Sequence, residues 1–281
     1  MKKSLVLIML VVALVATAAF GFMACNKQGY TIGVQAGTTG EYYVKGDVDW
    51  DFAGFANVTC APYNNGGLAV QAMKNGTVNA VIIDEAPAKA LAARIEGIKV
   101  IDVKLTEEEY AYGVDKAQGS LLTSINAILA SSEFATKKAE IMNAYFGDGT
   151  PTPVTAATSA DGSKADQQLV VATNAEFAPF EYKDGDKFAG VDMEIAAYIA
   201  NTLGLELVIL DMEFDAVVTS VGKNYVDIAM AGLTVNETRK ESVNFTTSYY
   251  NASQMLVVLA NDTTFDGLTT VEEIEAKIKT L

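Results

Sequence analysis

The sequence predicts an α/β fold made of two lobes, and three observations lead to this prediction. Short apolar segments typical of strands alternate with amphipathic segments typical of helices along the 281 residues. Without an N-terminal leader of 24 residues, the remaining 257 are near the size at which one hydrophobic core divides into two. Residues 72–84 (AMKNGTVNAVIID) also resemble residues 220–232 (SVGKNYVDIAMAG), although any two strand-and-helix units look alike to this degree.

The individual elements follow from the spacing of apolar residues. Runs rich in Val, Ile and Leu predict strands at 31–35, 79–83, 98–103, 168–173, 205–210, 226–230 and 255–259. Apolar residues three and four positions apart predict helices at 66–75, 86–95, 119–131, 134–146, 190–203, 214–222, 236–242 and 270–280. This alternation favours mostly parallel sheets. Residues 147–168 contain almost no large apolar side chain and are predicted to form a flexible linker.

Residues 1–24 have the pattern of an export signal, with two lysines before an apolar run that is too short to favour a membrane-spanning helix. The run ends at Phe22-Met23-Ala24-Cys25, which resembles a bacterial lipobox and implies cleavage before Cys25 and acylation of its thiol. An ordinary signal peptide followed by an accidental cysteine is the alternative. Lipidation would hold the exported chain, with residues 25–29 as a tether, at the outer face of the cytoplasmic membrane, at the cell surface or in the periplasm.

The composition excludes several classes of protein. The chain has no His, and therefore no Ser-His-Asp or Cys-His catalytic system and no His-ligated zinc site. A net charge of −15 argues against nucleic acid as a partner. Two Cys cannot form a disulfide scaffold, and Cys60, in an apolar segment, is predicted to be a buried and unreactive thiol. No cofactor and no metal ion is implied.

Several motifs between residues 168 and 250 carry a family resemblance. They are QLVVATNAEFAPFEY at 168–182, GVDME at 190–194, MEFD at 212–215, AGLTVNETRK at 231–240 and Tyr-Tyr at 249–250. In this spacing the sequence resembles the bacterial extracellular solute-binding proteins of family 3, which serve polar amino-acid ABC importers. The resemblance implies the periplasmic-binding-protein type II fold, in which two α/β lobes are joined by two crossover hinges.

The elements of the family's second lobe come first in this chain. Residues 31–43 (TIGVQAGTTGEYY) resemble the start of that lobe, and 119–147 resemble the closing helices. The resemblance therefore implies a circular permutation, with residues 30–111 and 260–281 in the second lobe and residues 112–146 and 169–259 in the first lobe. A truncated tandem protein is the alternative. Crossovers near 110–114 and 255–260 would act as hinges.

The matched positions imply a site for the backbone of a free amino acid. Arg239, with Gly232, Thr234 and Thr38, would hold the α-carboxylate, because a planar guanidinium binds a carboxylate through two parallel hydrogen bonds. Asp84 ends an apolar strand and would hold the α-ammonium group, unless it only caps the helix that follows.

The same resemblance implies positions for the ligand side chain. Phe177 and Phe214 would pack on it, whereas Phe180 is assigned to the core. Asn174 and Gln35 are expected to set specificity. Family members for cationic ligands often carry an acid at the position of Asn174, which weakens an interpretation in favour of Lys or Arg.

The resemblance implies a monomeric clamp that closes on a free amino acid and passes it to an ABC permease in the membrane. A ligand-sensing module for a receptor is one alternative. A second is an enzyme such as a dehydratase on the same fold, for which Glu176 is the unassigned acid beside the site. Arg239 and Asp84 together suit a zwitterion that is bound unchanged, so the chain is not expected to be an enzyme.

Overall fold

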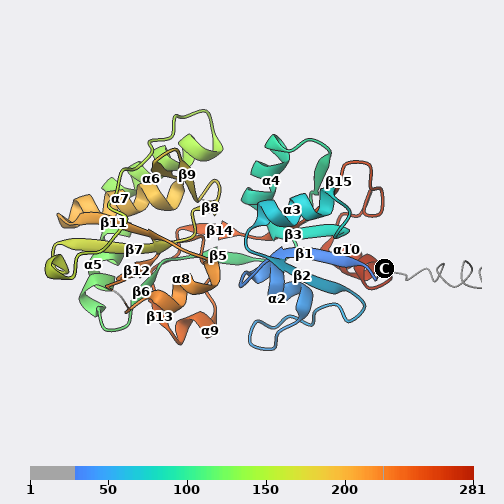
Figure 1. The fold of residues 1–281 in the computed structure, drawn as a ribbon, viewed down its shortest axis with the longest axis horizontal. Helices are drawn as coiled ribbons and strands as arrows, with labels where there is room; N and C mark the ends of the chain where they lie inside the picture. The colour runs from blue at the N-terminus through green and yellow to red at the C-terminus, as the bar shows by residue number, and fades with distance from the viewer. Residues whose placement is uncertain (1–28, 224) are drawn as a thin grey trace, which may run out of the picture.

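The computed structural model describes residues 29–223 and 225–281. The predicted export signal at 1–24, the predicted lipidation site Cys25 and the tether as far as residue 28 lie outside the described residues. Within the described ranges, no helix has both the length and the apolar character that crossing a bilayer requires. Figure 1 shows two lobes side by side, joined by extended segments.

The second lobe is built on a five-stranded sheet with the strand order β2-β1-β3-β15-β4. Its strands are β1 (Thr31–Gln35), β2 (Thr59–Tyr63), β3 (Ala80–Asp84), β4 (Ile98–Ile101) and β15 (Gln254–Leu259), and its helices are α2 (Thr39–Lys45), α3 (Gly66–Lys74), α4 (Glu85–Arg94) and α10 (Val271–Ile278). β1 is parallel to β2 and β3, whereas β15 is antiparallel to β3 and β4. β1 and β3 are buried along their whole length, as expected of strands covered on both faces.

The first lobe has a sheet of the same size, with the strand order β11-β7-β12-β6-β13. Its strands are β6 (Gly113–Asp115), β7 (Gln168–Thr173), β11 (Glu206–Asp211), β12 (Ile228–Ala229) and β13 (Val243–Phe245), and its helices are α5 (Gly119–Leu129), α6 (Ser132–Phe146), α7 (Val191–Leu203), α8 (Phe214–Ser220) and α9 (Glu237–Lys240). A small antiparallel sheet of β8 (Glu176–Phe177), β9 (Glu181–Asp184) and β10 (Lys187–Ala189) follows β7 in the chain. β6 is antiparallel to β12 and β13, so each large sheet contains one reversed strand.

Two short strands connect the lobes. β5 (Glu108–Tyr110) and β14 (Tyr250–Ala252) pair with each other in antiparallel fashion and run between the two large sheets in Figure 1. Each is followed directly by the reversed strand of the lobe it enters. The fold is therefore the predicted periplasmic-binding-protein type II fold, with two α/β lobes and two crossovers.

The predicted position of the second crossover, near 255–260, is wrong. The strand β15 belongs to the sheet of the second lobe, where Leu256 pairs with Ile82 of β3 and with Ile101 of β4. The crossing therefore takes place at β14, before residue 254, and the first lobe does not extend to residue 259. β15 lies between β3 and β4 and pairs with both, so its apolar residues belong to the core of the second lobe.

Residues 147–168 do not form the predicted flexible linker. Val154 forms a backbone bridge with Phe188, and Ala157 forms one with Val208. The N–H of Thr152 donates to the Glu194 carboxylate at 2.7 Å. A few small apolar side chains are enough to hold this polar segment on the first lobe, because the backbone makes most of the contacts.

The beginning of β1 and the helix α10 lie side by side. Tyr30 packs on the core cluster that contains Ile274 and Ile278 of α10, and the side-chain amide of Asn57 donates to the carbonyl of Ile278 at 2.9 Å. In Figure 1 the C-terminus is marked next to the start of the coloured chain. One hydrophobic core therefore joins the two ends of the described chain.

Candidate functional site

A narrow cavity lies between the two lobes, at the ends of their central strands. Its lining is Thr38, Thr39 and Asp84 from the second lobe and Phe177, Phe214, Gly232, Thr234 and Arg239 from the first lobe. All of these residues except Thr39 were assigned to ligand binding from the sequence motifs. Loops after the carboxyl ends of strands are where open α/β sheets bind ligands.

Arg239 is the cation of this cavity. It lies on α9, whose first turn is fixed by Asn236, because the Asn236 side-chain oxygen accepts the backbone N–H of Arg239 at 2.7 Å. The guanidinium donates through Nη1 to the carbonyl of Thr234 at 2.8 Å and through Nη2 to the carbonyl of Gly37 at 3.1 Å. A guanidinium has five N–H groups, so three of them make no hydrogen bond within the described part of the chain.

The contact with Gly37 crosses from the first lobe to the second. Arg239 is only 8% exposed, and this burial lowers the pKa of its guanidinium from the ordinary value. Gly37 has φ +74°, a backbone conformation that residues with a side chain rarely adopt. Glycine therefore suits the turn after β1, whose carbonyl accepts from the guanidinium.

Asp84 is the acid of the cavity and ends the central strand β3. Its side chain makes no capping hydrogen bond to α4, so the alternative of simple capping is wrong. Instead, its Oδ1 accepts the hydroxyl of Tyr110, on the crossover strand β5. Burial, and after it the charge of Glu108, raise the pKa of Asp84 to about 7.

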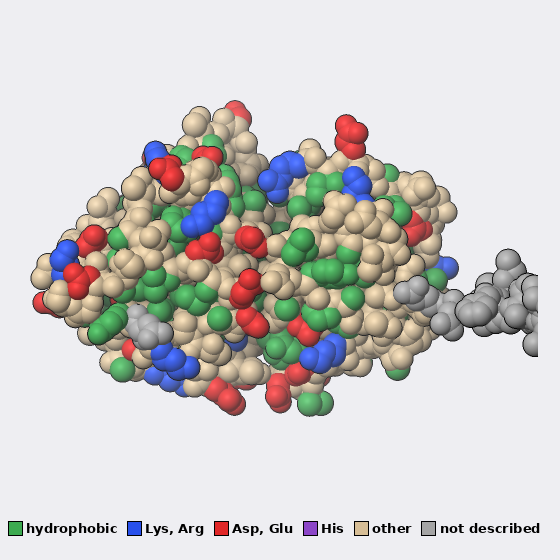
Figure 2. Space-filling view, viewed as in Figure 1, with side chains coloured by type: hydrophobic (Ala, Val, Ile, Leu, Met, Phe, Trp, Pro, Cys, Tyr) green, Lys and Arg blue, Asp and Glu red, His purple; other side chains and the backbone are tan. Residues whose placement is uncertain are grey.

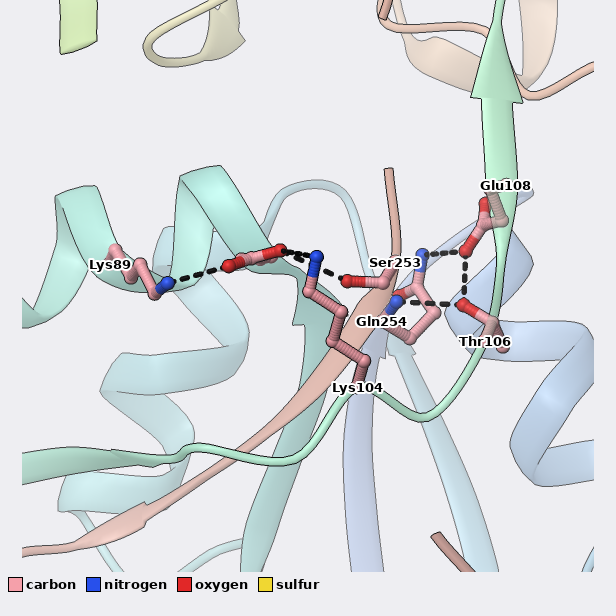
Figure 3. A network of polar contacts seen from close by, with 7 residues as sticks. Lys89, Lys104, Thr106, Glu108, Ser253 and Gln254 are labelled. Carbon is pink, nitrogen blue, oxygen red and sulfur yellow. Dashed lines mark hydrogen bonds and ion pairs between the residues drawn. The ribbon is translucent and has the colours of Figure 1, made fainter. Parts of the chain in front are cut away.

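Glu108 on β5 was not singled out from the sequence, yet it joins the two lobes. Its Oε2 accepts the hydroxyls of Thr39 in the second lobe at 2.7 Å and of Thr234 in the first lobe at 2.6 Å. Figure 3 shows its other oxygen, Oε1, facing Thr106 and Gln254, which donate at 2.6 Å and 3.0 Å. Glu108 lies within a run of three Glu residues that reads as a solvated surface, so no sequence signal marks it.

Three of the four predicted carboxylate donors are already used within the protein. The Thr234 hydroxyl donates to Glu108, and the Gly232 N–H donates to Oδ2 of Asp192 at 2.9 Å. The Thr38 hydroxyl likewise donates to the carbonyl of Gln35 at 2.8 Å. Of the four predicted donors, Arg239 is thus the one with N–H groups left over in the described structure.

Gly232 has a second role, because its lack of a side chain leaves space for the rings of Phe177 and Tyr110. Its φ is +53°, and a side chain there would lie 2.9 Å from the Phe177 ring and 3.3 Å from the Tyr110 ring. Phe177 and Phe214 are nearly buried and form the aromatic wall of the cavity. Phe180 is fully buried and stacks on Phe177 at 6.0 Å between ring centroids, so its assignment to the core is confirmed.

Asn174 and Gln35 do not line the cavity. Gln35 donates through Nε2 to Oδ1 of Asn174 at 3.1 Å, across the two lobes, and both residues are buried. The Asn174 amide also donates to the carbonyl of Met212 at 2.9 Å. Within the described part of the chain, Oε1 of Gln35 is a buried acceptor with no hydrogen-bond donor. Such an acceptor costs free energy until a donor reaches it.

Other candidate chemistries receive little support from the described residues. No group of His, Cys, Asp and Glu in residues 29–223 and 225–281 has the arrangement of a metal site. Cys60 is only half-buried, so the prediction of a buried thiol is wrong. Its partial burial still raises the pKa of the thiol to about 11, which agrees with the prediction of an unreactive thiol.

Comparison with known proteins finds a matching family. Residues 169–279, less than half of the chain, match the bacterial extracellular solute-binding proteins, family 3. This part of the chain is therefore similar to that family. The matched residues include Arg239, Gly232 and Thr234, whereas Thr38 and Asp84 lie outside the match.

Several relatives are named for the amino acids they bind. The arginine-binding extracellular protein ArtP of Bacillus subtilis is 37% identical over 36% of this chain and 40% of the relative. The histidine-binding periplasmic protein of Escherichia coli is 28% identical over 40% of this chain and 42% of the relative. The arginine-bound form of a truncated ArgBP from T. maritima is 37% identical over 32% of this chain and 43% of that chain, with a TM-score of 0.30. The chain therefore spans about two fifths of the length of these curated relatives.

Proposed function

We propose that this solute-binding protein captures a free polar amino acid between its lobes and delivers it to an ABC importer. The observation that carries the proposal is the pairing of Arg239 and Asp84 in one cavity, on opposite lobes. A free amino acid is a zwitterion, so it needs one cationic and one anionic partner at a fixed spacing. The relatives named for arginine and histidine support an amino acid as the ligand.

The roles of the two charged groups follow from their hydrogen bonds. The three remaining N–H groups of Arg239 suit a bidentate contact with the α-carboxylate. The Asp84 carboxylate would receive the α-ammonium group. The hydroxyls of Thr38 and Thr234 would turn from Gln35 and Glu108 toward the ligand carboxylate, since a hydroxyl rotates freely about its C–O bond.

The ligand side chain is proposed to carry a hydrogen-bond donor. Phe177 and Phe214 provide flat apolar surfaces for its stem. Gln35 lies outside the cavity lining, so the ligand side chain would reach its Oε1 by parting Gln35 from Asn174. A guanidinium, an amide or an imidazole would then donate to this acceptor, which has no donor among the described residues, and would remove the cost of its burial. On the face shown in Figure 2, acidic side chains gather along the line where the lobes meet, and their field would attract a ligand with a positive side chain.

Lobe closure would couple binding to delivery. Among the described residues, the hydrogen bonds that join the two lobes include Arg239 to Gly37, Gln35 to Asn174 at 3.1 Å, Thr39 to Thr234 at 3.2 Å and Asn65 to Glu176 at 2.5 Å. Closure would bend the paired strands β5 and β14, and the closed form would dock as a monomer on the permease. A ligand-sensing role would use the same clamp with a receptor in place of the permease.

The cellular setting is proposed from the sequence motifs. The chain would be exported by the signal at residues 1–24 and held to the membrane through a lipid on Cys25. We also propose that the chain is a circular permutant of the family. The contacts between Tyr30 and α10 support this, because they bring together the two segments that the family's usual order joins.

A thermal-shift screen of the common amino acids tests the proposed function. A ligand that binds only the folded protein stabilises it, by about 2.7 kcal/mol at a hundredfold excess over Kd, and therefore raises the melting temperature. We expect a response to a few polar amino acids, recovery of the ligand unchanged, and uptake of the same ligand by cells that contain the permease. A screen in which no amino acid raises the melting temperature would overturn the proposal.

A further inference from the structure

A short hairpin of the second lobe extends toward the ligand cavity. Asp47 and Phe52 exchange two backbone hydrogen bonds of 2.9 Å, which close residues 47–52 into a tight loop. Phe52 and Phe55 anchor the loop by packing on the ring of Tyr43, at centroid distances of 5.4 Å and 5.6 Å. The hairpin is therefore attached firmly to the core of the second lobe.

The hairpin places Trp50 against the cation of the first lobe. The Trp50 ring stacks on Tyr42 of α2 at 4.6 Å with an interplanar angle of 25°, which fixes the orientation of the indole. The guanidinium carbon of Arg239 lies 5.2 Å from the centroid of the Trp50 ring and 5.4 Å from that of Phe214. Two aromatic rings, one from each lobe, therefore contact the guanidinium.

The two rings act differently when the lobes move. Phe214 and Arg239 belong to the same lobe, so their contact survives opening, whereas the contact of Trp50 with Arg239 exists only while the lobes are together. An aromatic face attracts a guanidinium, and more strongly when the pair is shielded from water. The buried guanidinium has lost most of its hydration, so the indole offsets part of that loss in the closed form alone.

We propose that Trp50 is a positioning residue that acts through Arg239, holding the guanidinium in the orientation that receives the ligand carboxylate and favouring the closed form. This inference rests on the proposed function. The indole contacts the guanidinium of Arg239, and the carbonyls of Thr234 and Gly37 accept two of its N–H groups. The ligand carboxylate would complete this set of contacts. Loss of the indole should therefore speed ligand release more than it slows association.

Trp50 also provides its own signal, because it is the only Trp in the chain. Indole emission responds to the neighbouring charge and to exposure, and both change when the lobes close around Arg239 and a carboxylate. Titration of the full chain with L-arginine, L-glutamine and L-histidine should therefore change the emission of Trp50, with the same Kd that calorimetry gives for the amino acid that binds.

The variants Trp50→Leu and Trp50→Phe test the role, with Val48→Ala as the control. Val48 lies on the same hairpin and is 95% exposed, so its truncation leaves Arg239 untouched. We expect Trp50→Leu to weaken binding of the titrated amino acid by about 2- to 30-fold through a faster koff. Trp50→Phe should recover part of the affinity, and Val48→Ala should bind like the unaltered protein.

The outcomes separate this inference from the proposed function. Unaltered affinity in Trp50→Leu, or an emission that stays constant at saturation, would overturn the role of Trp50 while leaving the amino-acid site intact. If Trp50→Leu lowered the stability of the unliganded protein, measured by its melting temperature, by as much free energy as it lowered binding, the role of Trp50 would be merely structural. Failure of every common amino acid to bind the unaltered protein, by calorimetry and thermal shift, would overturn the proposed function and the role of Trp50 with it.

Discussion

Arg239 is prepared for an anion by the protein itself. The Asn236 cap fixes its backbone, and the carbonyls of Thr234 and Gly37 orient its guanidinium. A lysine at this position would keep the charge but could not hold both carbonyls and still offer two parallel donors to a carboxylate. The geometry of the guanidinium, more than its charge, should therefore determine affinity.

Replacement of this residue gives the first prediction. Arg239→Lys should weaken binding of the amino acid found in the screen by about 2–5 kcal/mol, because a buried charge pair loses one correctly shaped partner. Isothermal titration calorimetry measures the change. The neighbouring Lys240→Ala is the matched control, since the ion pair that Lys240 forms in the described structure is with Glu237, on the surface of the same helix. Equal losses in the two variants would contradict a specific role for Arg239.

Asp84 leads to a prediction about pH. Burial and the charge of Glu108 raise its pKa to about 7, so below that pH the unliganded protein carries a neutral acid at this position. An ammonium group pairs with the ionised form, and binding must then release a proton. Affinity should therefore rise with pH, up to about tenfold per unit below pH 7, and level off above about pH 8.

Two variants separate Asp84 from a buried acid of the first lobe, Asp192. Burial also raises the pKa of Asp192, which accepts the N–H of Gly232, to about 7. Asp84→Asn should bind weakly with an affinity that no longer depends on pH between 6 and 8, a window set by the pKa of about 7. Asp192→Asn should keep the dependence. Calorimetry at several pH values measures the affinity of both variants. If Asp192→Asn abolished the pH dependence, the titrating group would be Asp192 and the prediction for Asp84 would be wrong.

At the scale of elements, the crossover strand β5 does more than connect the lobes. It carries Glu108, whose single oxygen Oε2 receives a hydroxyl from each lobe. In the proposed clamp, opening would separate at least one of these pairs, because Thr39 and Thr234 would move apart with their lobes. β5 would then provide both a hinge and a contact that favours closure.

Replacement of Glu108 should have two separable effects. Glu108→Gln removes a charged acceptor, and a hydrogen bond to a charged group contributes about 1.5–3 kcal/mol, so affinity at pH 8 should fall roughly tenfold or more. The loss of its negative charge should also move the midpoint of the pH profile of Asp84 to lower pH. The exposed neighbour Glu109 supplies the control, and a Glu109→Gln variant with the same shift would contradict a local effect.

The elements that the sequence predicted well are those with one continuous pattern. The bounds of β1 and β7 agree with the predicted ranges, because both strands are apolar and buried from end to end. The crossover strand β5 was not predicted as a strand, since Glu-Glu-Tyr has no apolar pattern and its pairing with β14 depends on distant sequence. The lobe of β15 and the packing of residues 147–168 likewise depend on partners that local spacing does not reveal.

The site shows the same division between pattern and geometry. The family resemblance of the motifs implied almost every residue of the cavity lining, because each lies at a matched position. They did not reveal which donors the protein itself uses, such as the Gly232 N–H held by Asp192. Nor did they mark Thr39 or Glu108, whose roles arise only when the two lobes meet.

At the scale of the whole molecule, the order of the segments should matter less than their contacts. Tyr30 and Asn57 already touch α10, through the shared core cluster and the 2.9 Å hydrogen bond to Ile278. Residue 281 could thus be joined to residue 30 without moving either lobe, and exposed connections tolerate new chain ends. The loop between α6 and the bridge at Val154 offers such a connection, since Thr150 is exposed.

A reordered chain tests this directly. Residues 151–281 followed by residues 30–150 should fold with the circular dichroism spectrum of the 30–281 chain and bind the same amino acid, because every sheet and both crossovers keep their partners. A second reordered chain cut between Val170 and Val171 should fail to fold, because this cut divides the buried strand β7 at the centre of the first lobe. If the first chain also failed, the present order would be required for folding, and the two orders would not be interchangeable.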